Sequence, residues 1–180
     1  MHFLKYKIFY FIDEFNKEHI LKINKNINLI FRNHKKKFNL KFYKNLKKFC
    51  QSNGYKIYLA NNVKIANSLS YDGVYLSSFN KKFLKNRNFK LNFKILGSAH
   101  NIKEIKHKEK QGVKYIFLSP IFHKFDKKGL GLIKFKNLSN NCLSQIVALG
   151  GINNKNINKL NLINIRCFAS INYIKKIYDR

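Results

Sequence analysis

Eight short apolar segments recur along this chain at spacings that suit alternating strands and helices. Each is a continuous run, without the alternation of apolar and polar residues typical of a strand with one face in solvent. Strands buried on both faces have this pattern, which favours a parallel sheet covered by helices. We expect the eight strands at 7–12, 27–31, 56–60, 73–76, 94–96, 115–118, 146–149 and 166–169.

Two of the intervening segments carry clear helix signals. Residues 42–52 repeat apolar side chains at helical spacing and are followed by Asn-Gly, a typical helix end. Residues 101–111 begin with Asn101, a capping residue, carry Glu104 three positions later and stop before Gly112. We predict a helix over each segment.

Eight strands with intervening helices are the content of a TIM (β/α)8 barrel, an α/β fold. A chain of 180 residues is short for this fold, so we expect shortened helices, among them the connections at 13–26 and after residue 76. No linker rich in Pro, Gly or Ser divides the chain, and no repeat of about 20 to 50 residues is evident. We therefore expect residues 1–180 to form a single barrel domain.

The formal net charge of +29 would by itself favour nucleic acid, a membrane surface or small anions as partners. The lysines, however, are spread along the chain, and its abundant Asn, Ile, Phe, Tyr and Lys are the residues that A/T-rich codons encode. We therefore expect no specific nucleic-acid partner. The sequence leaves open whether the charge has a function or reflects composition.

The apolar residues give no membrane signal. No uncharged apolar run reaches the length of about 18 residues that a spanning helix needs, and Lys5 and Lys7 interrupt the apolar stretch near the N-terminus. Cys50, Cys142 and Cys167 are too scattered for a disulfide framework or a zinc site. We expect no membrane span, no signal peptide, three reduced and mostly buried thiols, and a cytoplasmic protein.

The predicted strand at 146–149 stops abruptly at Gly150 and Gly151. Glycine has no Cβ, so it adopts positive φ and lets backbone N–H groups approach an anion closely. We interpret the pair as a cradle for a phosphate group. A tight turn between a strand and a helix is the alternative interpretation.

The residues that follow the strands of such a barrel gather at one mouth. Arg32 can bind phosphate oxygens at two points, Lys127 supplies an ammonium group, and Ser170 adds a hydroxyl beside the glycine pair. We expect two anion sites, one at the glycines with Ser170 and one at Arg32 with Lys127. Alternatively, Arg32 and Lys127 are surface residues and Ser170 is a helix N-cap.

Three further polar positions are considered as candidates for the site: His100, His123 and Asp72. His100 either orients a substrate or is a hydrogen-bonded structural histidine, and His123, beside lysines, is expected to be solvated. Asp72 precedes its strand, which predicts a turn at the end of the barrel away from the chemistry. Neither histidine is identified as a base by the sequence.

The order of these strand ends resembles the thiamine phosphate synthase and thiazole tautomerase family. The resemblance covers nearly the whole chain and rests on seven pieces in order: Tyr-Phe-Ile-Asp at 10–13, Arg32, Leu-Ala-Asn-Asn at 59–62, Asp-Gly-Val-Tyr-Leu at 72–76, Ile-Leu-Gly-Ser-Ala-His at 95–100, Pro-Ile-Phe at 120–122 followed by Lys127, and Val-Ala-Leu-Gly-Gly-Ile-Asn at 147–153. It implies a TIM barrel that joins a hydroxymethylpyrimidine diphosphate to a thiazole phosphate and releases pyrophosphate.

The resemblance also implies a role for each of the candidate residues. Arg32, Asn61 and Lys127 would face the pyrophosphate, and Ser98 would lie near the reacting pyrimidine. The glycine pair would hold the thiazole phosphate together with Ser170. Phosphorylated pyrimidine and thiazole molecules are thus the expected partners, while no oligomeric state is predicted.

Two departures from the family pattern leave the function open. The resemblance implies Mg²⁺ held by two aspartates, but Asn62 and Asn80 stand at those positions, and amides bind a hard dication more weakly than carboxylates. The loop after Lys127 is cut short at 128–131, and the run Lys-Lys-Gly-Leu at 127–130 resembles the tautomerase branch. The alternatives are therefore a thiazole tautomerase-like isomerase, which would need His100 or His123 for proton transfer, and a non-catalytic binder of phosphorylated ligands.

Overall fold

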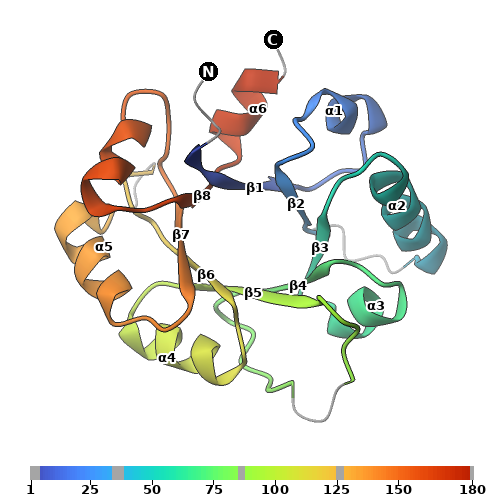
Figure 1. The fold of residues 1–180 in the computed structure, drawn as a ribbon, viewed down its shortest axis with the longest axis horizontal. Helices are drawn as coiled ribbons and strands as arrows, with labels where there is room; N and C mark the ends of the chain where they lie inside the picture. Colours follow the sequence, from blue (N-terminus) through green and yellow to red (C-terminus); the bar gives the residue numbers. More distant parts are fainter. Residues whose placement is uncertain (1–4, 34–38, 85–87, 125–127, 179–180) are drawn as a thin grey trace.

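The computed structural model describes residues 5–33, 39–84, 88–124 and 128–178. Eight parallel strands close into a barrel in chain order, which confirms the predicted fold (Figure 1). Because all strands run the same way, their carboxyl ends share one mouth. The strands are β1 (Lys7–Ile12), β2 (Asn28–Phe31), β3 (Ile57–Ala60), β4 (Gly73–Leu76), β5 (Lys94–Ala99), β6 (Tyr115–Leu118), β7 (Gln145–Leu149) and β8 (Cys167–Ala169).

Most strand bounds lie within one residue of the prediction, and β5 is the exception. It continues to Ala99, because Ser98 and Ala99 pair with β6 opposite Phe117 and Leu118. The prediction that Ser98 follows its strand is therefore wrong. Small residues pair in the barrel as well as large ones, but they do not extend an apolar run in the sequence.

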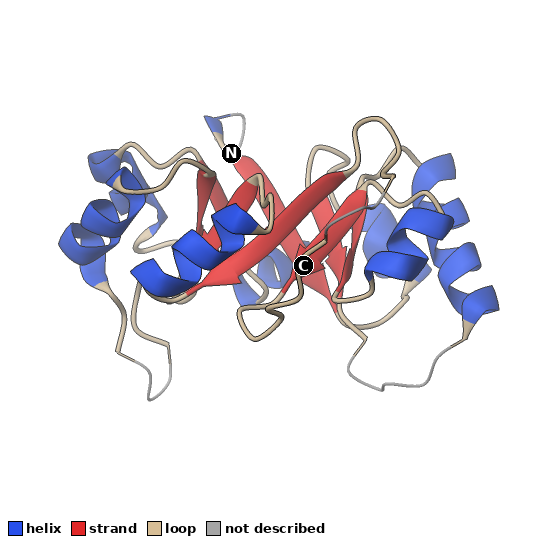
Figure 2. Ribbon diagram, turned by 90° about the horizontal axis from the view of Figure 1, so that it is seen from below, coloured by secondary structure: helices blue, strands red, loops and turns tan. Residues whose placement is uncertain are grey.

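Helices surround the barrel, and Figure 2 shows them on either side of the tilted strands. They are α1 (Lys17–Lys22), α2 (Leu40–Ser52), α3 (Val63–Ser68), α4 (Ile102–Lys110), α5 (Gly131–Asn140) and α6 (Asn172–Tyr178), with a 3₁₀ helix, η2, at Ile157–Ile163. Both predicted helices are confirmed, and the Asn101 side chain caps α4 by accepting from the Glu104 amide. As expected, α1 is short, and the described residues between β4 and β5 form no helix.

The continuous apolar runs divide between two cores, because alternate residues of a strand face opposite ways. One core lies between the strands and the helices, and includes Ile8, Tyr10 and Ile12 of β1. The other fills the barrel interior and is rich in aromatic rings. Its buried members are Phe9, Phe11, Ile30, Tyr58, Tyr75, Leu96, Tyr115, Phe117, Val147, Cys167 and Ala169.

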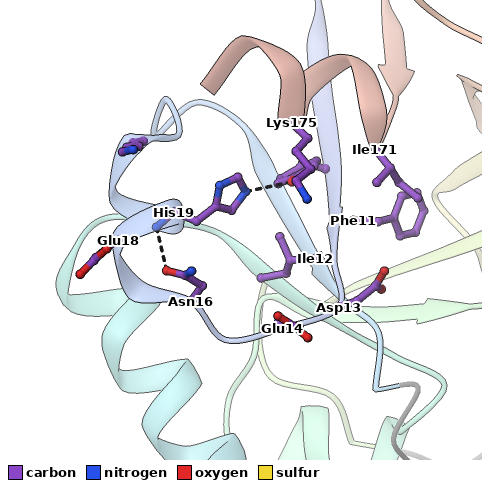
Figure 3. Close-up of a pocket in the computed structure, with 11 residues that line it drawn as sticks. Phe11, Ile12, Asp13, Glu14, Asn16, Glu18, His19, Ile171 and Lys175 are labelled. Atoms are coloured by element: carbon purple, nitrogen blue, oxygen red, sulfur yellow. Dashed lines mark hydrogen bonds between the residues drawn. The ribbon is translucent and has the colours of Figure 1, made fainter. Parts of the chain in front are cut away.

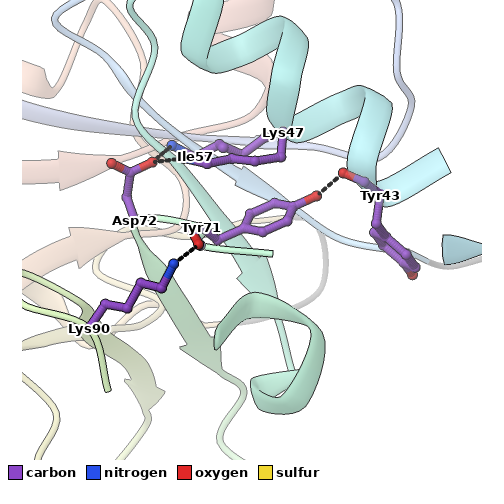
Figure 4. A network of polar contacts seen from close by, with 7 residues as sticks. Tyr43, Lys47, Ile57, Tyr71, Asp72 and Lys90 are labelled. Atoms are coloured by element: carbon purple, nitrogen blue, oxygen red, sulfur yellow. Dashed lines mark hydrogen bonds and ion pairs between the residues drawn. The ribbon is translucent and has the colours of Figure 1, made fainter. Parts of the chain in front are cut away.

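Asp72 ties helix and strand together at the amino end of β4 (Figure 4). Its Oδ2 accepts from the Ile57 amide at 2.9 Å and from Lys47 Nζ at 3.2 Å. Directly beside it, Gly73 leaves no room for a side chain, since a Cβ there would lie 1.9 Å from the Lys94 carbonyl oxygen. Asp72 therefore lies opposite the mouth, as its place before the strand predicted.

The cysteines and the helices agree with the expectations of unpaired thiols and of no membrane span among the described residues. Cys50, Cys142 and Cys167 are free thiols, with Cys50 and Cys167 buried. Burial raises the pKa of Cys50 and of Cys142 to about 12. Within the described part of the chain, every helix is too short or too polar to cross a bilayer.

Candidate active site

Arg32 lies at the mouth, directly after β2, and is held by Asp13 directly after β1. Its Nε and Nη2 donate to Asp13 Oδ1 and Oδ2 at 2.8 and 2.9 Å. The guanidinium carbon lies 4.9 Å from the centre of the Phe11 ring, which belongs to the barrel interior. The Arg32 side chain thus lies at the mouth, and its ion pair with Asp13 was not indicated by the sequence alone.

Aromatic rings from three strands close the barrel beneath Arg32. The Phe11 and Phe117 rings each lie 5.2 Å from the Tyr75 ring, edge to face. Burial raises the pKa of the Tyr75 hydroxyl to about 12, while its hydrogen bond with Ser98 and the charge of Arg32 act in the opposite direction. The side chains of Arg32, Tyr75 and Ser98 therefore converge from β2, β4 and β5.

Asn61 bridges the ends of β3 and β4. Its Nδ2 donates to Ser77 Oγ at 2.8 Å, and its Oδ1 accepts from the Ser77 amide at 2.9 Å. The residue has a φ of 57°, in the left-handed region where asparagine is among the tolerated residues. This conformation and the two hydrogen bonds fix the Asn61 amide at the rim of the mouth.

Asn62 and Asn80, the positions predicted for a metal, lie in different surroundings. Asn62 Oδ1 caps α3 by accepting from the Ile65 amide at 3.1 Å. Asn80 Nδ2 points instead to Asn61 Oδ1 at 3.4 Å. Among the described residues, no three His, Cys, Asp or Glu side chains come together as metal ligands. The residues present therefore do not fit a metal ion held by the protein.

Gly150 and Gly151 have φ values of 95° and 72°, the positive values expected of the glycine pair. A Cβ on Gly151 would lie 2.6 and 2.7 Å from the backbone oxygens of His123 and Phe122. The pair is therefore required for close packing against the loop that follows β6, as the tight-turn alternative implies. No described residue accepts a hydrogen bond from the backbone N–H of Gly151 or Ile152, so the cradle stays a prediction.

Ser170 follows β8 and is buried. Its Oγ accepts from the Tyr173 amide at 3.2 Å, which gives it the capping role that was the alternative to phosphate binding. The hydroxyl proton is not used by this bond, so capping and donation to a ligand are compatible.

The remaining predicted groups contribute less to the mouth. His100 Nδ1 lies 2.8 Å from the Ser119 carbonyl oxygen, which agrees with a hydrogen-bonded structural histidine. The His123 side chain is exposed, as expected. Lys127 lies outside the described residues, so its role at the pyrophosphate stays a prediction.

A pocket of about 550 Å³ opens beside the mouth, between the end of β1, α1 and α6. Figure 3 shows Asp13 and Phe11 on its wall together with Ile171 from the segment after β8. Tyr10 and His19 also line the pocket, and Tyr10 Oη lies 2.9 Å from His19 Nε2. Asp13 therefore links this pocket to Arg32 at the mouth.

The family model described as thiamine monophosphate synthase matches residues 20–174. The chain belongs to the thiamine monophosphate synthase family. The family that the ordered strand ends predicted is thereby confirmed, together with its assignment to thiamine biosynthesis.

Individual members of the thiamine monophosphate synthase family agree with this assignment. A thiamine-phosphate synthase of Clostridium acetobutylicum is 29% identical over 141 residues, which cover 74% of this chain and 67% of that protein. One from Prochlorococcus marinus is 31% identical over 140 residues, which cover 76% of this chain and 40% of that protein. The chain therefore spans only part of the length of these relatives.

A solved structure supports the fold. The thiamine phosphate pyrophosphorylase from Pyrococcus furiosus matches with a TM-score of 0.75 at 20% identity, over 96% of this chain and 91% of that one. At this identity, the likeness establishes the barrel and does not assign individual side chains.

Two features of the site were missed by reasoning from the sequence. The Arg32–Asp13 pair joins residues 19 positions apart, so it follows only from the register of two strands. Lys108 is buried under the β4–β5 connection. Its position three residues after Ile105, on the apolar face of α4, was the available signal.

Proposed function

We propose that this protein is a thiamine-phosphate synthase-like transferase, which joins a hydroxymethylpyrimidine diphosphate to a thiazole phosphate and releases pyrophosphate. Membership of the thiamine monophosphate synthase family supports the class of reaction. The observation that carries the proposal is the convergence of Arg32, Tyr75 and Ser98 over an aromatic floor at the mouth. This arrangement would combine a group able to bind anions with buried aromatic rings able to keep water from the reacting atoms.

Arg32 suits the diphosphate end of the first substrate. A guanidinium group carries five N–H donors in a fixed plane, and Asp13 engages two of them. The other donors can bind phosphate oxygens and stabilise the negative charge that grows on the leaving pyrophosphate. Asn61 lies at the neighbouring rim, where its amide can add a neutral donor.

The aromatic floor suits the pyrimidine. Departure of pyrophosphate leaves a pyrimidine cation, which must meet the thiazole nitrogen before it meets water. The Phe11, Tyr75 and Phe117 rings shield this position, and ring faces attract positive charge. The hydroxyl groups of Tyr75 and Ser98 can fix the orientation of the pyrimidine by hydrogen bonds.

The segments after β7 and β8 suit the thiazole phosphate. The Gly151 and Ile152 amides and the Ser170 hydroxyl would donate to its oxygens, in the position where barrels commonly hold a phosphate. The two phosphorylated substrates would then approach the aromatic floor from different sides of the mouth.

Magnesium has no place in this proposal as a resident ion of the protein. Asn62 and Asn80 supply amide oxygens in place of carboxylates, and the Asn62 oxygen already caps a helix. The proposed route for Mg²⁺ is entry with the diphosphate, whose own oxygens would be its main ligands.

Two other functions remain as alternatives to the transferase. The neutral amides at 62 and 80 favour a non-catalytic binder of the same ligands. The thiazole tautomerase alternative depends on His100, whose Nδ1 is held by Ser119 and whose Nε2 could then exchange a proton.

The proposed compartment is the cytoplasm, in agreement with three free thiols that a reducing compartment maintains. The function is tested by incubating the protein with hydroxymethylpyrimidine diphosphate, thiazole phosphate and Mg²⁺, and measuring thiamine phosphate by mass spectrometry. Product above the protein-free rate supports the transferase. Binding of both substrates without product would establish the non-catalytic alternative.

A further inference from the structure

Lys108 on α4 carries its ammonium group into the buried space between the helix and the barrel. The residue is only 1% exposed. Its Nζ donates to the carbonyl oxygens of Ser77 and Asn80, each at 2.8 Å, and to Gln111 Oε1 at 3.0 Å. An ammonium group has three N–H donors, so every donor has an acceptor.

The other side chains on this face of α4 hold the same segment. Gln111 Nε2 donates to the carbonyl oxygens of Asn80 and Lys82 at 3.0 and 2.8 Å. A ring nitrogen of His107 lies 3.0 Å from the Lys81 carbonyl oxygen. His107 and Lys108 of α4, with Gln111 at its C-cap, therefore bind four backbone carbonyls between positions 77 and 82. We call this set of contacts, made by His107, Lys108 and Gln111, the α4 clamp.

The barrel provides space for the lysine stem. A Cβ built on Gly97 of β5 would lie 3.0 Å from Lys108 Cδ and 3.1 Å from Val113 Cγ2. Any larger residue at 97 would displace the stem. The absence of a side chain on β5 and the long side chain on α4 are therefore complementary.

The clamped segment reaches the mouth through Asn61. Ser77 makes two hydrogen bonds with the Asn61 amide, and Asn80 Nδ2 contacts Asn61 Oδ1. Lys108 binds the carbonyl oxygens of the same Ser77 and Asn80. A continuous series of contacts thus runs from the buried Lys108 ammonium on α4 to Asn61 at the end of β3, the strand next to the one that Arg32 follows.

We propose that Lys108 is a positioning residue, which holds the segment at 77–80 so that Asn61 and Asn80 are oriented toward the diphosphate of the substrate. The inference rests on the proposed function and deepens it. The described residues of the β4–β5 connection form no helix of their own, so the contacts of the α4 clamp are what hold the segment at 77–82. Hydrogen bonds from an ammonium group are stronger than those from neutral donors, which suits this role.

The role predicts a selective effect on one substrate. In Lys108→Met, a side chain of similar length keeps the apolar contacts and loses the three hydrogen bonds. We expect the dissociation constant of inorganic pyrophosphate to rise about tenfold, while that of thiazole phosphate stays within about twofold, both measured by isothermal titration calorimetry. The KM for the pyrimidine diphosphate should rise in parallel, and amide hydrogen exchange should increase at 77–82.

Lys103→Met is the matched control. It removes one positive charge from an exposed position of the same helix, and should change neither ligand's affinity. If Lys108→Met does not fold, Gln111→Met serves as the second variant, since it removes two contacts to the same segment. Gln111→Met should also weaken pyrophosphate binding and leave thiazole phosphate binding unchanged.

The possible outcomes separate the two proposals. Unchanged pyrophosphate binding in a folded Lys108→Met variant overturns the positioning role, and so does an equal loss of both ligands, because that would be a general structural effect. Wild-type protein that binds neither ligand overturns the proposed function and the positioning role with it. If wild-type protein binds both ligands and Lys108→Met loses affinity for pyrophosphate alone, the proposed function and the positioning role are both supported.

Discussion

Arg32 and Asp13 are joined by two parallel hydrogen bonds of 2.8 and 2.9 Å between the ends of neighbouring strands. A planar guanidinium held at two points, above the Phe11 ring, has its orientation set before a ligand binds. An anion-binding group that is already oriented loses less conformational freedom on binding. In the proposed function, the pair would set the direction from which the diphosphate approaches Arg32.

Arg32→Lys tests this relationship. Lysine keeps the charge but cannot reproduce the two-point contact, so we expect product formation to fall about tenfold or more. Because the pair is partly exposed, the free energy of unfolding should change by less than about 1 kcal/mol. Steady-state assays and urea denaturation would measure the two effects. Arg166→Lys, at an exposed arginine, is the control, and equal activity in both variants would remove Arg32 from the site.

Gly151→Ala should damage both packing and phosphate binding. The new methyl group would meet the Phe122 and His123 carbonyl oxygens, in addition to the strain of a φ of 72°. Gly131 has the same φ and nothing within 4 Å of its Cβ position, so Gly131→Ala isolates the strain, which costs about 1 kcal/mol.

The comparison of these two variants decides between the interpretations of the glycine pair. A larger loss of stability in Gly151→Ala, measured by denaturation, would reflect the packing contact. If thiazole phosphate also fails to bind to folded Gly151→Ala but binds to Gly131→Ala, the cradle is supported. Equal affinity in the two variants would contradict it.

Replacing Asn62 and Asn80 by aspartate should create a binding site for Mg²⁺. Asn62→Asp keeps the cap of α3, because aspartate caps as well as asparagine does. Asn80→Asp places a carboxylate against Asn61 Oδ1, where a cation would relieve the repulsion between oxygens. We expect the double variant to bind Mg²⁺ more tightly than wild type, by about tenfold or more. Titration calorimetry with Mg²⁺ alone measures this, and an unchanged affinity would show that the two positions do not share an ion.

Asp72→Ala should lower stability without affecting the mouth. The change leaves the Ile57 amide and the Lys47 ammonium without their acceptor, at a cost of about 1–3 kcal/mol for an unsatisfied donor. Because Asp72 lies at the opposite end of the barrel, affinity for both phosphorylated substrates should persist. Denaturation midpoints measure the stability, and ligand titrations measure the affinity. A loss of affinity at unchanged stability would contradict the placement of Asp72 at the end of the barrel opposite the mouth.

The charge of Lys108 should make stability depend on pH. Burial lowers the pKa of Lys108 to about 8, with Glu104 acting in the other direction. Between this pKa and its ordinary value, the unfolded chain holds more protons than the folded one, so stability rises with pH. Wild type should therefore gain stability relative to Lys108→Met between about pH 8 and about pH 10. Urea denaturation of both proteins at several pH values measures the difference, and a constant difference would mean that the Lys108 pKa is not lowered.

The sequence predicted the barrel because its physical cause is local. A strand buried on both faces must be apolar throughout, and eight such runs are visible without knowledge of their partners. The end of β5 was misplaced because Gly97 and Ser98 fit the barrel by their small size. They are not strongly apolar, so they do not extend the apolar run that marked the strand in the sequence. The ion pair of Arg32 and the burial of Lys108 depend on contacts between distant elements, which no single segment encodes.

The β4–β5 connection has a wider consequence for how far a (β/α)8 architecture can be reduced. Lys108 and Gln111 hold residues 77–82 by hydrogen bonds to their backbone carbonyl oxygens. These residues do not lie in a helix. A βα unit can thus lose its helix while the barrel stays closed, provided that side chains of the neighbouring helix donate hydrogen bonds to the backbone carbonyl oxygens of the connection. Miniaturised barrels could be designed on the same rule, with one long cationic side chain assigned to each omitted helix.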